Sequence, residues 1–204
     1  MPHICSAKPF LLLNDLKNCV KKNSKLIALS FVLAFAGAAL GALIACKIGE
    51  KAAPYSVFAC LFKLSYAPFS FVFSYLLRFF LYLLIASFGF FLPFSAFYPS
   101  IALVLYGRSV ARNVATAFLT DSIGCSVLSL VFVELPLFLL GVSLFAFTFV
   151  KVSERKMCRG IALNAKTLTE ILPYLLKCLT LYFIALILIF VVICGATYLC
   201  VVVL

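Results

Sequence analysis

The stretch LIALSFVLAFAGAALGALIAC, residues 26–46, decides the fold of this chain. It contains no charged residue and is bracketed by Lys25 and Lys47. About 20 such residues in a helix cross the roughly 30 Å of hydrocarbon in a bilayer. The stretch is also too long for the apolar core of an ordinary secretory signal. It therefore predicts a membrane-spanning helix that begins directly after a lysine-rich segment.

Comparable apolar stretches follow along the rest of the chain. Hydrophobic residues make up 66% of the 204, and the mean hydropathy is +1.24. Only helices and closed barrels satisfy their backbone polar groups in lipid, and continuous rather than alternating apolar runs favour helices. We expect an all-α, polytopic transmembrane helical bundle of about five spans, within a range of four to six. The expected spans, which make residues 26–204 one transmembrane domain, are 26–46, 69–91, 94–119, 124–150 and 172–204.

Two segments do not have the pattern of an ordinary membrane span. Residues 47–68 mix Glu50, Lys51 and Lys63 with aromatic residues and predict a loop on the far side. The third apolar segment is interrupted at residues 106–113, YGRSVARN, so it is either a broken helix or one that leaves the membrane early. Gly89 and Pro93 predict a tight break before that segment.

Positive charge collects at the ends of the apolar stretches. The chain has 17 Lys+Arg against 6 Asp+Glu, a net charge of +11. Residues 1–25 and the segment between the fourth and fifth spans are the richest, which places both on the cytoplasmic side. We expect residues 1–25 to form an amphipathic basic segment with a cytoplasmic N-terminus, and the protein to lie in the cytoplasmic (inner) membrane. Membrane lipids, rather than nucleic acid, are the expected partners of these charges.

The first span carries a face of small residues. Gly37 and Gly41 form a G-x-x-x-G motif, which Ala34 and Ala38 extend. Such a face lets another helix approach closely. The face serves either packing within the bundle or contact with a partner, which includes a second copy of the chain.

Charged residues also lie inside the apolar segments. Arg78 and Glu134 occupy the middle of the second and fourth spans at similar depths, so that they can pair. Arg108 and Arg112 share a helix face, and Asp121 at the following boundary can meet one of them. An unpaired charge at this depth costs at least about 2.5–3.5 kcal/mol. These residues form either a polar cavity, ion path or headgroup site, or internal pairs that hold the helices in register.

The residues that an enzyme would need are missing from the sequence. His3 is the single histidine, and we find no nucleophile with a base, no carboxylate pair and no phosphate loop. The cysteines are spread singly and offer no grouped metal ligands. We therefore expect no enzymatic activity, no catalytic residues, no cofactor and no metal.

The order of these pieces resembles the stage II sporulation protein M family. The resemblance covers most of the chain, from the basic N-terminal helix and the Gly/Ala-rich first span through the aromatic loop and the apolar hairpin. The residues that carry it further are Gly89, Pro93, Gly107, Ala111, Ala115, Gly124 and Pro136. It implies a polytopic inner-membrane protein without enzymatic activity, whose partners in spore formers are peptidoglycan-degrading enzymes at the septal membrane during engulfment.

Two functions follow as expectations. The first is a non-enzymatic membrane scaffold that recruits membrane-anchored cell-wall hydrolases through helix contacts and the loop at 47–68. The alternative is a small transporter or permease subunit, in which the intramembrane charges line a polar path through the bundle.

Overall fold

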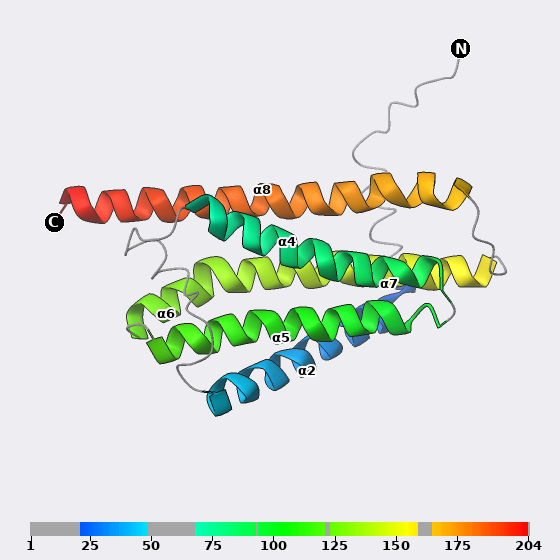
Figure 1. Cartoon of the computed structure of the whole chain (residues 1–204), viewed down its shortest axis with the longest axis horizontal. Helices are drawn as coiled ribbons and strands as arrows, with labels where there is room; N and C mark the ends of the chain where they lie inside the picture. Colours follow the sequence, from blue (N-terminus) through cyan, green and yellow to red (C-terminus); the bar gives the residue numbers. More distant parts are fainter. Residues whose placement is uncertain (1–20, 49–67, 93, 121–122, 159–164, 204) are drawn as a thin grey trace, which may run out of the picture.

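A computed structural model of the chain describes residues 21–48, 68–92, 94–120, 123–158 and 165–203 (Figure 1). Every regular element in these residues is a helix, as predicted. The main helices are α2 (Ser24–Ile48), α4 (Pro68–Ser87), α5 (Phe97–Thr120), α6 (Ile123–Ser129), α7 (Leu135–Cys158) and α8 (Ala165–Val203). A 3₁₀ turn, η2 (Phe88–Phe90), follows α4, and a π-helical turn, η3 (Leu130–Glu134), joins α6 to α7.

Four helical segments are long and apolar enough to cross a membrane. They are Ser24–Lys47, Val72–Phe90, Ser126–Glu154 and Ile171–Val192. Helix α5 has 24 residues, a similar length, but is less apolar because it carries Arg108, Arg112 and Asn113. The protein is therefore a membrane-embedded helical bundle in which α5 is the most polar of the long helices.

Helix α5 lies between α2 and the layer formed by α4 and α7 (Figure 1). It packs against α2, α4 and α7, while α8 packs on α4 and α7 along the upper edge of Figure 1. The long helices alternate in direction along the chain. The Asn23 side chain donates to Glu154 Oε1 at 3.2 Å, so the start of α2 and the end of α7 meet. Lys25 and Lys151, from the two basic segments, accordingly lie at one end of the bundle; which side of the membrane that end faces stays a prediction.

The alternative of a broken third helix is wrong. Helix α5 runs without interruption through residues 106–113. Gly107 lies on the face of α5 that meets α2, where an added Cβ would come within 2.9 Å of the Ala34 carbonyl carbon. The glycine therefore permits close helix approach instead of ending the helix. The break before α5 begins around Gly89, where it was predicted, with the 3₁₀ turn η2. It continues through Phe94, whose φ is 60°, so α5 begins at Phe97, three residues later than the expected start at residue 94.

The fourth helical segment changes register near its start. The Leu135 N–H bonds to the Leu130 carbonyl, five residues back, which closes a π-helical turn. Pro136 follows at once and has no N–H to offer to the preceding turn. Such single π turns redirect the side chains on either side of them. Here Val133 and Glu134 are turned into the protein interior.

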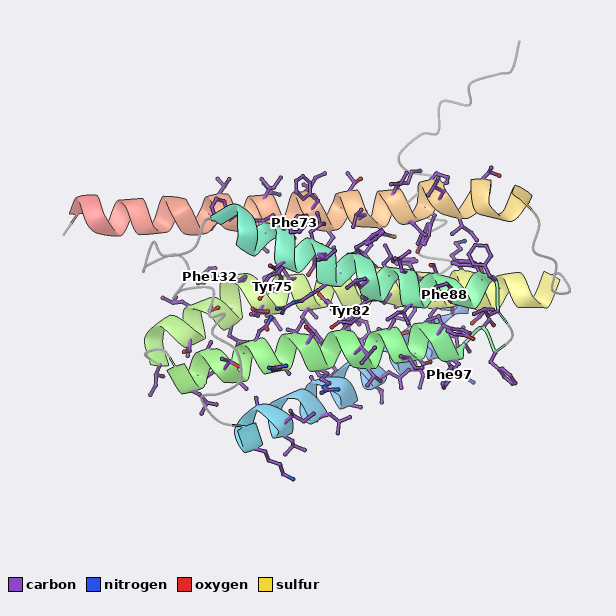
Figure 2. All side chains as sticks on the ribbon, in the orientation of Figure 1. Phe73, Tyr75, Tyr82, Phe88, Phe97 and Phe132 are labelled. Atoms are coloured by element: carbon purple, nitrogen blue, oxygen red, sulfur yellow. The ribbon has the colours of Figure 1, made fainter. Side chains whose placement is uncertain are left out.

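Aromatic side chains fill the interior between α4, α5, α7 and α8. The rings of Phe79 and Tyr182 stack with centroids 3.8 Å apart, and Tyr106 stacks on Phe138. The Tyr106 hydroxyl donates to the Leu137 carbonyl at 2.7 Å. Exposed rings such as that of Phe73 lie on the outer face of the same helices (Figure 2). This core fixes α4 against α5, and with it the polar residues that the two helices share.

Candidate functional site

A polar cavity of about 360 Å³ lies between α4 and α5. Helix α4 contributes Arg78 and Tyr82, and Figure 2 places Tyr82 between the two helices. The remaining lining residues come from α5 and repeat every three or four positions, which puts them on one helix face. They are Leu105, Arg108, Ser109, Arg112, Asn113 and Thr116. We call this cavity the arginine pocket.

Three guanidinium groups, those of Arg78, Arg108 and Arg112, line the arginine pocket, and none of its lining residues is acidic. A charge in the hydrocarbon region is costly unless a partner compensates it. Guanidinium groups present a fork of N–H donors that matches the oxygens of carboxylate, sulfate and phosphate groups. The arginine pocket is therefore suited chemically to an anion.

Arg78 is connected to Glu134 through two neutral side chains. Arg78 Nη1 donates to Asn113 Oδ1 at 3.4 Å, and Asn113 Nδ2 donates to the Tyr75 hydroxyl at 3.1 Å. The Tyr75 hydroxyl in turn donates to Glu134 Oε1. The direct ion pair that similar depth suggested does not form between these two residues. The reason is that Asn113 of α5 and Tyr75 of α4 occupy the space between them.

Glu134 is buried, with 2% of its surface exposed. While Oε1 accepts from Tyr75, Oε2 has no hydrogen-bond partner within the part of the chain that the structure describes. Glu134 lies outside the lining of the arginine pocket, at the far end of the hydrogen-bond chain from Arg78. The structure thus brings together three of the charged residues named from the sequence, Arg78, Arg108 and Arg112, in the arginine pocket. Asp121 lies outside the described residues.

The small-residue face of α2 is used inside the chain. An added Cβ on Gly37 would come within 2.8 Å of Val104 Cα, and one on Gly41 within 2.9 Å of Arg108 Cα. Ala34 is fully buried, and the Ala38 backbone nitrogen lies beside Gly107. Of the two alternatives, the structure shows packing within the bundle. Contact with Gly41 also holds the backbone of Arg108, whose side chain lines the arginine pocket.

Sequence reasoning missed the neutral members of the site. Asn113, Ser109 and Thr116 share a face of α5 with the two arginines, and this periodicity of polar residues in an apolar helix was a usable signal. Tyr75 stands three residues before Arg78 and so falls on the same face of α4. Nothing in the sequence indicated that Tyr75 would meet Glu134, since that contact depends on the turn at η3.

The fold and the arginine pocket together define a class, an all-helical membrane protein with a partly open cationic cavity between two helices. Comparisons of this chain with protein families, with curated proteins and with solved structures gave no match. The resemblance to the stage II sporulation protein M family therefore stays a prediction.

Proposed function

We propose that the protein is a small membrane transporter or permease subunit that binds an oxyanion in the arginine pocket. The observation that supports this most strongly is the set of three guanidinium groups around one cavity without an acidic lining residue. An anion bound there would supply the compensating charge that the lining residues lack. The proposal develops the second of the two functions expected from the sequence.

The hydroxyl and amide groups of the arginine pocket support the same proposal. Ser109 and Asn113 line the cavity beside the arginines, whereas the Thr116 hydroxyl already donates to the Arg112 carbonyl at 2.8 Å. Hydroxyl groups donate to oxyanions, and hydrogen bonds to a charged group contribute about 1.5–3 kcal/mol each. A tetrahedral oxyanion such as sulfate or inorganic phosphate matches this mixture of charged and neutral donors.

Equilibrium dialysis of the purified protein in mild detergent tests binding. We expect radiolabelled sulfate and phosphate to bind, and Arg108→Gln or Arg112→Gln to weaken binding by about 10- to 150-fold, the equivalent of one charged hydrogen bond. Lys177→Gln is the matched control, because this exposed lysine of α8 lies outside the arginine pocket. Absence of binding by the unaltered protein, or equal loss in the control, contradicts the proposal.

Transport needs a separate measurement in liposomes. Protein reconstituted into vesicles should take up labelled sulfate down its gradient, and Arg108→Gln should abolish uptake while leaving the amount of inserted protein unchanged. Binding in detergent without uptake into vesicles contradicts the transporter part of the proposal.

The scaffold function stays a prediction. The glycine pair, for which partner contact was one of two alternatives, packs against α5, and the loop at 47–68 lies almost entirely outside the described residues. Cross-linking in native membranes followed by mass spectrometry separates the two functions. Recovery of membrane-anchored peptidoglycan hydrolases favours the scaffold and the septal membrane, whereas recovery of an ATPase or permease favours transport.

A further inference from the structure

The buried carboxyl group of Glu134 is not accounted for by the arginine pocket. One of its oxygens accepts from Tyr75, and the other has no partner among the described residues. An ionised carboxylate is expensive to bury unless a positive charge or several donors compensate it. The positive charge nearest to it along the hydrogen-bond chain is that of Arg78.

Within the part of the chain that the structure describes, few other ionisable groups interact with Glu134. From α4 these are Tyr75 and Arg78, from α5 Tyr106, and from α8 Tyr182. The charged residues of α2 lie at its two ends, Lys25 and Lys47. Among the described residues, Arg78 is thus the cation that compensates Glu134, and it is also a lining residue of the arginine pocket.

We infer that binding of an anion in the arginine pocket is coupled to uptake of one proton by Glu134. This inference rests on the proposed function. With the arginine pocket empty, the charge of Arg78 compensates the carboxylate through Asn113 and Tyr75. A bound anion pairs with Arg78 and adds negative charge beside it, and both changes disfavour the ionised carboxylate.

Uptake of a proton by Glu134 removes the carboxylate charge that the bound anion disfavours. The proton comes from bulk water and forms an O–H bond at Oε2, the oxygen without a partner. The bound anion's charge and the proton's charge enter together, and both leave together when the anion dissociates. Anion and proton would therefore move in the same direction.

Titration calorimetry on the full chain in detergent tests this coupling. Sulfate is the probe, because it does not itself titrate near neutral pH, and buffers of different ionisation enthalpy report the protons taken up. We expect about one proton per sulfate bound, and an affinity that weakens by up to about tenfold per unit of rising pH. Glu134→Gln should bind sulfate without proton uptake and without this pH dependence, because the amide oxygen can still accept from Tyr75.

Two further variants make the result specific. Glu154→Gln removes the half-buried carboxyl near the end of α7, which contacts Asn23 and Lys151, and should leave proton uptake unchanged. Tyr75→Phe removes the hydroxyl that links Asn113 to Glu134 and should also lower proton uptake. This variant tests the coupling independently, in case Glu134→Gln does not fold. Sulfate binding without proton uptake, or uptake that persists in Glu134→Gln, overturns the coupling and leaves the proposed function intact. Absence of sulfate binding overturns the proposed function, and the coupling with it.

Discussion

Gly37 of α2 and Val104 of α5 lie so close that no side chain fits between them. A Cβ on Gly37 would stand 2.8 Å from Val104 Cα. One turn further along α2, Gly41 meets the backbone of Arg108 in the same way. The G-x-x-x-G motif therefore fixes the height of α5 relative to α2, and α5 carries most of the arginine pocket.

Replacing Gly37 with leucine should separate α2 from α5. The new side chain would meet backbone atoms, which cannot move aside as a flexible side chain can, and overpacking of this kind costs about 1–3 kcal/mol or more. The midpoint of thermal unfolding in detergent, monitored by circular dichroism, measures the effect. Gly124→Ala is the control, since an added Cβ there meets nothing within 4 Å. Equal midpoints for Gly37→Leu and the unaltered protein would show that the two helices do not pack as described.

Two neighbouring phenylalanines of α4 should differ in their effect on stability. Phe79 is 1% exposed and stacks on Tyr182, whereas Phe80 is 40% exposed. We expect Phe79→Ala to lower the free energy of unfolding by about 3–5 kcal/mol. Phe80→Ala should cost much less, because lipid or detergent replaces the lost contacts. Denaturation with increasing SDS measures both, and a larger loss for Phe80→Ala would contradict the orientation of α4.

The arrangement of the helices could be predicted only in part from the sequence. Uninterrupted apolar runs were sufficient to predict helices, because lipid leaves the backbone no other partner. The glycines of α2 predicted a close contact, but its partner depended on Gly107, more than sixty residues away. Depth along a span predicted an Arg78–Glu134 pair. That ion pair does not form, because pairing also depends on the direction in which each side chain leaves its helix. For Glu134 the π-helical turn at η3 sets this direction.

The ends of the bundle can be tested with paired cysteines. Because Asn23 Nδ2 and Glu154 Oε1 are 3.2 Å apart, Asn23→Cys combined with Glu154→Cys should be joined within one chain by a short bifunctional thiol reagent, in a background without the nine native cysteines. Asn23→Cys combined with Ile123→Cys should not, since the straight part of α7 alone separates Glu154 from the end that carries α6 by about 28 Å. Cross-linking is read as a mobility shift on a gel. A mobility shift for the Asn23/Ile123 pair alone would contradict the described topology, because it would place the start of α2 beside α6 and not beside the end of α7.

Exposure to a charged thiol reagent should distinguish the arginine pocket from the site of Glu134. Arg108 is exposed and lines the cavity, so Arg108→Cys in the cysteine-free background should react readily in intact membranes. Glu134 is 2% exposed and lies behind Tyr75 at the end of the hydrogen-bond chain. Glu134→Cys should therefore stay unlabelled until SDS unfolds the protein. Dividing the labelling in membranes by the labelling after SDS corrects for differences in the amount of the two variants. Equal labelling of both positions in the membrane would mean that water reaches Glu134 directly, and that Tyr75 does not separate it from the arginine pocket.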